Sequence, residues 1–198
     1  MKLPQERVKD DVNFYFEYHH RLRDFYSIAK YFYSPDTEKE RFITNNDAFF
    51  LITAYATWAL VVVDLCKIFS DSQNQKHNII KLLNDIRTKP EYNPILLKVG
   101  ENSLDKYLEK INLKQNTIDK LKILRDKHYV HVDNLELDLN ELQNPTFQET
   151  EDLLNLLKEI VTSIGHNAFN IHYDFSETSD SGNFNPMRII QDIVRQRQ

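Results

Sequence analysis

The sequence predicts an all-α fold, on the evidence of its punctuation and its hydrophobic spacing. Only 3 glycines and 6 prolines interrupt 198 residues, too few for the many turns of a β-sandwich or barrel. Apolar residues recur at steps of three and four, the spacing of helices with a buried face. Twelve Phe and ten Tyr supply bulky core side chains. A chain of this length favours one domain with a sizeable core.

The first helix is expected over residues 4–33, from an early-turn proline to the break "SPD". Two apolar stripes on this helix indicate burial on more than one side, within a bundle or against a second copy of the chain. The first stripe holds Val8, Val12, Tyr15, His19, Leu22, Tyr26, Ala29 and Tyr33, and the second holds Phe14, Tyr18, Phe25, Ile28 and Phe32.

The second helix is expected over residues 41–70 and is apolar around its circumference, which is typical of a central core element. Its stretch "AFFLITAYATWALVVV", residues 48–63, lies between Asp47 and Asp64 and is shorter than the roughly 20 apolar residues that span a bilayer. We therefore interpret it as a buried core helix and expect no membrane association.

Further helices are expected over residues 74–87, over 94–111 as one helix or as two interrupted near Gly100, and from a cap at Asn116 onward. "TFQE", residues 146–149, has the capping-box pattern and opens a helix to about residue 169. A linker and a terminal helix then form a C-terminal extension over residues 172–198, after a helical domain over residues 1–171.

The net charge and the single cysteine limit which partners and which cellular compartment we expect. The net charge of −5 argues against general nonspecific binding to nucleic acid. Residues 105–127 nevertheless hold seven Lys and Arg against four acids, whereas residues 133–152 hold seven acids and no Lys or Arg. Two interpretations are open: two solvated helix faces, or a local basic rim. The single Cys66 and the charged N-terminal stretch, which lacks a signal-peptide pattern, predict a cytoplasmic protein.

The stretch "RDKHYVH", residues 125–131, contains the candidate residues for phosphate binding and proton transfer. At 100° per residue, Arg125, His128 and His131 follow one another at about 60° and share a broad helix face. His128 lies angularly between Leu121 and Leu124, which favours a packing or supporting role. Arginine binds phosphate through two parallel hydrogen bonds, and imidazole moves protons near neutral pH. The pair suits RNA cleavage by the 2′-hydroxyl, with a second copy completing the acid/base set.

The pattern of Arg125, the polar Asp126 and His131 resembles the signature of HEPN domains, which are compact antiparallel helical bundles. The apolar second helix, "LCKIFSD" leading to "HNIIKLL", and "LRDKHYVHVD" resemble the AbiU-like branch linked to abortive infection and phage defence. The likeness covers roughly residues 10–170.

The resemblance implies a metal-independent endoribonuclease without a cofactor, active as a homodimer and leaving a 2′,3′-cyclic phosphate and a 5′-hydroxyl. It implies Arg125 as phosphate ligand, His131 as general acid/base, and Asp126 as the group that orients Arg125 or the cleft. RNA and an antitoxin or another defence-system protein are the expected partners. Some relatives carry a modified tyrosine two residues after the motif histidine; here that position is Asp133, and Tyr129 is the tyrosine within the motif.

Three alternatives stay open at this point. Asp64 either orients Arg125 or forms an ordinary structural pair, since a carboxylate within "VVVDLC" needs solvent or a partner. His128, His131 and Asp133 also permit a metal site, although no further ligand group accompanies them. Finally, the whole chain is either an endoribonuclease or a noncatalytic helical module that binds RNA, a nucleotide or a protein.

Overall fold

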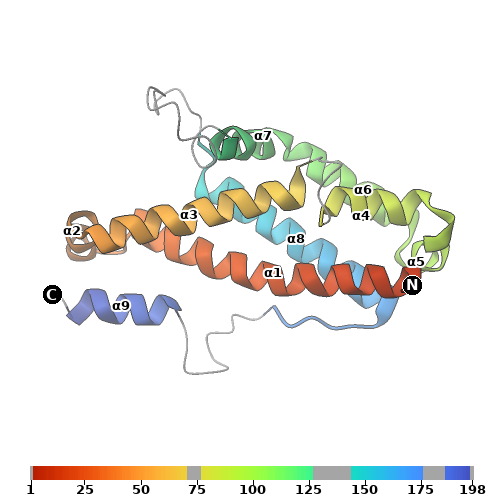
Figure 1. Ribbon diagram of the computed structural model, residues 1–198, viewed down its shortest axis with the longest axis horizontal. Coiled ribbons are helices and arrows are strands. Elements are labelled where there is room, and N and C mark those ends of the chain that lie inside the picture. Colours follow the sequence, from red (N-terminus) through yellow and green to blue (C-terminus); the bar gives the residue numbers. More distant parts are fainter. Residues whose placement is uncertain (1, 71–76, 127–143, 176–185, 197–198) are drawn as a thin grey trace. The chain divides into compact units, whose positions relative to one another are not determined.

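The computed structural model describes residues 2–70, 77–126, 144–175 and 186–196, with only the backbone for residues 186–190. Within these ranges every regular element is helical, which confirms the all-α prediction (Figure 1). The helices are α1 (Pro4–Tyr33), α2 (Glu38–Asn46), α3 (Ala48–Phe69), α4 (Ile79–Thr88), the 3₁₀ turn η1 (Pro90–Tyr92), α5 (Asn93–Val99), α6 (Glu101–Leu113), α7 (Gln115–Leu124), α8 (Phe147–Phe169) and α9 (Pro186–Gln196).

The chain forms two compact units. Unit 1 comprises Met1–His19 and Val62–Tyr173, and unit 2 comprises His20–Val61 and Asp174–Gln198. Both α1 and α3 are continuous helices that contribute one part to each unit. The division predicted from the sequence, residues 1–171 and 172–198, stays a prediction.

Helix α1 begins and ends where the sequence predicts. Seven residues of its first stripe, from Val8 to Ala29, are buried, and His19 is among them. Tyr33 is the exception, because half of its surface is exposed at the helix end. In the second stripe Ile28 and Phe32 are buried, so α1 is indeed covered on more than one side.

The helix expected over residues 41–70 is instead two helices, α2 and α3, separated at Asp47. A capping box starts α2, in which the Thr37 hydroxyl accepts from the Glu40 N–H and the Glu40 carboxylate accepts from the Thr37 N–H. The Asp47 carboxylate accepts from the Phe49 N–H at 2.9 Å and so begins α3. Both capping patterns are present in the sequence. The prediction followed the long apolar run instead and therefore joined the two helices into one.

Helix α3 is only partly the buried helix that the sequence predicts. By length and composition α3 is long and apolar enough to cross a membrane, but half of its apolar segment is buried inside the protein. Val61, Val62 and Leu65 are inaccessible, whereas Phe49 and Ile52 are more than half exposed. The C-terminal half of α3 is therefore core, and its N-terminal half has one apolar face in solvent.

Unit 1 is organised around α8, which contacts α5 and α6. Its capping box at Thr146 and Glu149 forms as predicted, and Leu153, Leu157 and Ile160 are inaccessible. Residues 94–111, expected to form one helix or two, form the two helices α5 and α6. Gly100 separates them with a φ of +86°, a conformation that favours glycine.

Two helix starts differ from the sequence predictions. The helix expected over residues 74–87 corresponds to α4. This helix begins at Ile79, with the Asn78 side chain as its cap, rather than near residue 74. Helix α7 begins at Gln115, and Lys114 rather than Asn116 occupies its cap position. The reason is that Lys114 already ends α6, which leaves no room for a separate loop.

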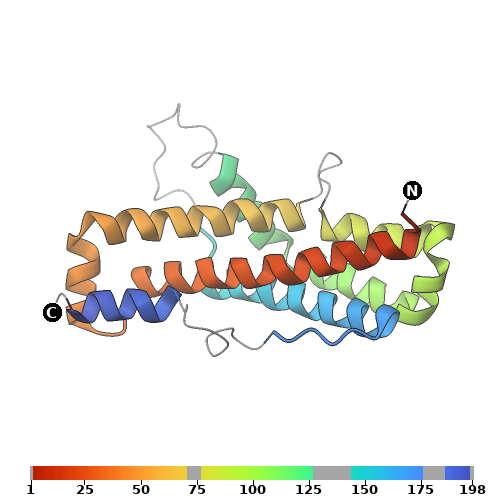
Figure 2. The ribbon, with the colours of Figure 1, turned by 60° about the horizontal axis from the view of Figure 1, so that its bottom comes forward.

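Unit 2 has a small core of its own. Helix α9 lies beside α2 (Figure 2). The inaccessible side chain of Val194 contributes to a cluster that the other helices complete, comprising Ile28, Tyr31, Phe32, Phe50 and Ala54. The predicted terminal helix is thus present and is part of a hydrophobic core.

Candidate functional site

The candidate site lies at the end of α7, in unit 1. Leu121 and Leu124 are buried and hold this end of the helix against the core. Arg125 follows, and its N–H still bonds to the carbonyls of Leu121 and Lys122. Arg125 and Asp126 are in π-helical geometry, which recurs at functional sites. The Arg125 side chain is 23% exposed, so its guanidinium is partly withdrawn from water.

Asp126 holds the Arg125 guanidinium by one defined contact. Arg125 Nε donates to Asp126 Oδ1 at 2.7 Å. This hydrogen bond raises the pKa of Arg125, against the opposing effect of burial. Because the contact uses Nε, the two Nη groups have no hydrogen bond to any described residue other than Asp126, and together they have the fork geometry that binds phosphate. The Asp126 carboxylate itself is about half exposed.

The C-terminal half of α3 supplies the other side of the site. Cys66 is buried, as predicted, and is close enough to Arg125 for each to shift the pKa of the other. Burial raises the pKa of the Cys66 thiol to about 12, and the nearby Arg125 only partly offsets this. The thiol is therefore neutral at physiological pH and does not compensate the charge of Arg125.

Asp64 lies two residues earlier on α3 and is 4% exposed. It accepts a hydrogen bond from Lys67 Nζ at 3.0 Å. This is the ordinary structural pair that the sequence allowed. An effect of Asp64 on Arg125 stays a prediction, because the carboxylate bonded to the Arg125 guanidinium in the described structure belongs to Asp126.

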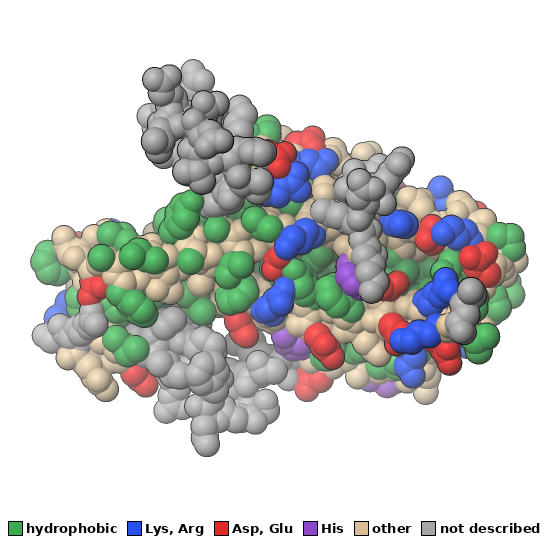
Figure 3. All heavy atoms as spheres, in the orientation of Figure 1, with side chains coloured by type: hydrophobic (Ala, Val, Ile, Leu, Met, Phe, Trp, Pro, Cys, Tyr) green, Lys and Arg blue, Asp and Glu red, His purple; other side chains and the backbone are tan. Residues whose placement is uncertain are grey.

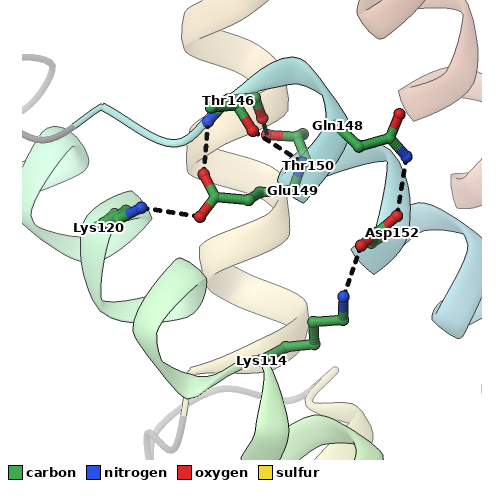
Figure 4. A network of polar contacts seen from close by, with 7 residues as sticks. All are labelled: Lys114, Lys120, Thr146, Gln148, Glu149, Thr150 and Asp152. Carbon is green, nitrogen blue, oxygen red and sulfur yellow. Dashed lines mark hydrogen bonds and ion pairs between the residues drawn. The ribbon is translucent and has the colours of Figure 1, made fainter.

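Three lysines from α6, α7 and the cap residue between them form ion pairs with α8, and Figure 4 shows the pairs of Lys114 and Lys120. Lys114 Nζ lies 2.5 Å from Asp152 Oδ2, Lys120 Nζ lies 2.8 Å from Glu149 Oε1, and Lys110 Nζ lies 2.6 Å from Glu159 Oε1. Neither interpretation of the charged segments anticipated this: positive residues before the motif pair with acids after it. Part of the expected basic rim therefore joins helices, and Arg125 is the better candidate for an anion ligand.

One comparison with known proteins decides the family. The HEPN_AbiU2 family model, described as AbiU2, matches residues 14–185. The chain belongs to the HEPN AbiU2 family. The match reaches farther toward the C-terminus than the resemblance over residues 10–170, and it ends before α9. Neither the curated proteins nor the solved structures include a match.

Membership of the HEPN AbiU2 family indicates a module of abortive infection and suggests ribonuclease activity. The predicted motif divides between two parts of the chain: Arg125 and Asp126 are described, whereas His128, Tyr129 and His131 lie outside the described residues. The alignment of those three with Arg125 stays a prediction. Asp133 also lies outside, so the alternative metal site is untested. No group of three or more His, Cys, Asp or Glu suited to a metal occurs in the described ranges.

An open groove between α6 and α8 was not anticipated from the sequence of this HEPN AbiU2 chain. It has a volume of about 440 Å³ and is lined by Tyr107 from α6 and by Asn155, Lys158, Glu159, Thr162 and Ser163 from α8. Lys110 lies over the Tyr107 ring and pairs with Glu159. A carboxylate on the lining disfavours phosphate binding, so Arg125 remains the candidate site.

Proposed function

We propose that this chain is a metal-independent endoribonuclease of a phage-defence or toxin–antitoxin system, cleaving RNA at a composite site between two copies. The observation that carries the proposal is the geometry of Arg125. The Arg125 side chain is three-quarters buried, its guanidinium is held through Nε by Asp126, and its two Nη groups have the fork geometry that binds a phosphate. It stands where the HEPN motif begins, in a chain that belongs to the HEPN AbiU2 family.

In this mechanism His131 removes the proton from the 2′-hydroxyl of the RNA. The 2′-oxygen then attacks the adjacent phosphorus while the Arg125 Nη groups stabilise the charge that develops on the non-bridging oxygens. The P–O5′ bond breaks, and the leaving 5′-oxygen takes a proton from the histidine of the second copy. The products are a 2′,3′-cyclic phosphate and a 5′-hydroxyl, so no water and no metal ion enters the cleavage step.

The surroundings of Arg125 support this role. A permanent charge beside the buried, neutral thiol of Cys66 interacts with an incoming phosphate more strongly than the same charge in water, since the local dielectric is lower. Asp126 is half exposed and therefore neutralises Arg125 only partly. The site thus retains net attraction for an anion, and we expect it in the cytoplasm, where RNA is the abundant polyphosphate.

The test is an RNA cleavage assay in EDTA with purified wild type, Arg125→Ala and His131→Ala. We expect the wild type to cleave and each variant to lose about 100-fold or more in rate, the usual effect of removing an acid/base or charge-stabilising group. Matched controls are Arg87→Ala, from an exposed pair with Asp105, and His166→Ala, from the exposed surface of α8. Both controls should cleave at the wild-type rate.

Two results would contradict the proposal. Cleavage that both site variants retain would remove Arg125 and His131 from the mechanism. A wild type that binds a partner without cutting any RNA would instead support the noncatalytic helical module. The exposed apolar side chains of α3 favour a protein as the partner of such a module.

A further inference from the structure

A group of stacked aromatic rings lies in unit 1, where α1 meets the chain just before α4. Phe14 and Tyr18 are one turn apart on α1, and their rings stack with centroids 5.0 Å apart. His77, next to the α4 cap residue, stacks on Phe14 at 3.9 Å, with 20° between the ring planes. Phe14, Tyr18 and His77 define the ring stack. In Figure 3, hydrophobic and histidine side chains reach the surface beside the C-terminal end of α3.

The ring stack rests on the core but is not enclosed by it. The buried ring of Tyr15 meets Phe14 edge to face, with centroids 5.6 Å apart, and so supports it from the core side. Phe14 and Tyr18 are half-buried, and 30% of the His77 side chain is exposed. A ring that is fixed by one stack and still reaches solvent can accept another flat ring, and every nucleobase offers one.

Asp11 fixes the orientation of the His77 ring. His77 Nδ1 lies 3.4 Å from Asp11 Oδ1, and the Asp11 side chain is one-third exposed. A carboxylate at this distance offsets positive charge on the imidazole and repels a phosphate. His77 therefore presents a flat surface rather than a charge, in contrast to Arg125.

The ring stack is tied to the helix end that carries the candidate site. Asn78, next to His77, donates from its side-chain amide to the Ser70 carbonyl at the end of α3. The Ser70 N–H donates to the Cys66 carbonyl at 2.9 Å, and Cys66 is the buried neighbour of Arg125. The ring stack and Arg125 both belong to unit 1, so one RNA strand can contact both.

Two lysines flank the ring stack in the chain. Lys67 is on the last turn of α3, where its half-exposed side chain pairs with the buried Asp64. Lys81 is exposed on the first turn of α4, four residues after His77. Sites for single-stranded nucleic acid combine aromatic rings, which stack on bases, with basic side chains, which contact the backbone. Both kinds of side chain are present here.

We propose that the ring stack binds a nucleobase of single-stranded RNA, with His77 as the stacking surface and Lys81 as a contact to the adjacent phosphate. The inference rests on the proposed function and deepens it, because a base that stacks on protein must be unpaired. Stacking tolerates any base, so the ring stack selects unpaired RNA rather than one sequence.

The first test measures binding of a 2′-O-methyl oligouridine that carries one 2-aminopurine, whose fluorescence falls when its ring stacks. We expect wild type to quench the fluorescence and His77→Ala to lose the quench and raise the dissociation constant about 10-fold or more. His77→Phe keeps a flat ring and should bind and quench as wild type does. The matched control is His166→Ala, at an exposed histidine of α8, which should also behave as wild type.

The second test measures the salt dependence of binding to the same oligonucleotide. Lys81→Gln should lower the slope of log affinity against log salt concentration by about 0.7, the value for one phosphate contact to a single strand. His77→Ala should leave that slope unchanged, because stacking releases no counterion. Lys39→Gln, at an exposed position of α2, is the control and should keep the wild-type slope.

Three results would overturn the inference: a wild type that does not quench the fluorescence, a quench that His77→Ala retains, or a duplex that binds as tightly as the single strand. If His77→Ala has a lowered thermal midpoint, His77→Phe decides, and loss of the quench in that variant also overturns the inference.

The 2′-O-methyl oligonucleotide lacks the attacking hydroxyl, so its binding tests the ring stack separately from catalysis. Quenching that depends on His77, in a protein that cuts no RNA, would support the ring stack and contradict the endoribonuclease. Cleavage of RNA with no quenching would contradict the ring stack alone. If both hold, His77→Ala should raise KM for RNA and leave kcat close to the wild-type value.

Discussion

At the scale of the residue, Arg125 and Asp126 form the best-defined part of the candidate site. Their 2.7 Å hydrogen bond engages one edge of a planar cation and so fixes the direction of the remaining donors. A lysine at position 125 would keep the charge but lose the planar fork. We therefore propose that Asp126 positions Arg125, and its removal should then weaken catalysis without abolishing phosphate binding.

Asp126→Asn should lower the rate of RNA cleavage by about 10- to 100-fold, because a hydrogen bond to a charged group is worth about 1.5–3 kcal/mol. The change should fall on kcat more than on KM, since the Arg125 charge persists. The control is Asp119→Asn, which alters an exposed carboxylate on α7 that pairs with Lys122. Equal kinetics for both variants would exclude Asp126 from positioning Arg125.

Cys66 illustrates what the sequence could and could not predict at this scale. Its place in an apolar run predicted a buried thiol, and the structure confirms that burial. Its proximity to Arg125 was not predictable, because the two residues are on helices far apart in the chain, and a spacing pattern reports only neighbours on the same helix.

The thiol of Cys66 should be almost inert in the native protein. With its pKa raised to about 12 by burial, less than about one thiol in a thousand is ionised at pH 8, and the thiolate is the reactive form. Labelling with Ellman's reagent at pH 8 should be slow in buffer and rapid in concentrated urea. Rapid labelling of the folded protein would show that the site opens on the time scale of the assay.

At the scale of the element, helices were predicted correctly where a single hydrophobic stripe continues along the chain. The predicted helix boundaries were wrong where capping residues lie next to a long apolar run. The length of α1 followed from its stripe and from the break after it. The division of α2 from α3 depended on Thr37, Glu40 and Asp47, three polar side chains beside a strongly apolar segment. Periodicity outweighed capping in the prediction, whereas the backbone hydrogen bonds of the caps decide the structure.

The ion pairs between α7 and α8 give unit 1 a defined response to acid. The hydrogen bond from Lys120 lowers the pKa of Glu149, and that from Lys114 lowers the pKa of Asp152. A carboxyl with a lowered pKa stabilises the fold above its ordinary value, 4.5 for Glu149 and 3.8 for Asp152. That stability is lost as the pH falls through the lowered values.

The double variant Lys114→Ala/Lys120→Ala should therefore unfold in less urea at pH 7 and show a shallower loss of stability between pH 5 and 3. Because both pairs are partly exposed, the cost at pH 7 is about 0.5–1 kcal/mol per pair. Lys39→Ala/Lys106→Ala removes the same charge at exposed positions and serves as the control. If the two double variants have parallel pH profiles, the α7–α8 pairs contribute nothing specific.

At the scale of the whole molecule, the folded structure continues beyond the last residue that the family model matches. The HEPN AbiU2 match stops at residue 185, yet α9, over residues 186–196, completes the core of unit 2. The sequence predicted this terminal helix from its pattern but could not predict its contacts, since the cluster around Val194 collects residues from α1 and α3. A segment beyond the family match is thus part of the folded molecule.

Val194→Asp should detach α9 and lower the stability of unit 2. An isolated carboxylate cannot remain in a cluster of Ile28, Phe32 and Phe50, so the helix must leave or the core must open. The lost burial of one valine alone corresponds to about 1.5–3 kcal/mol. Urea unfolding followed by circular dichroism measures the shift, and increased binding of anilinonaphthalene sulfonate reports the uncovered core. Gln196→Asp introduces the same charge at an exposed position of α9 and should change neither readout. Matching curves for the two variants would mean that α9 contributes no stability to unit 2.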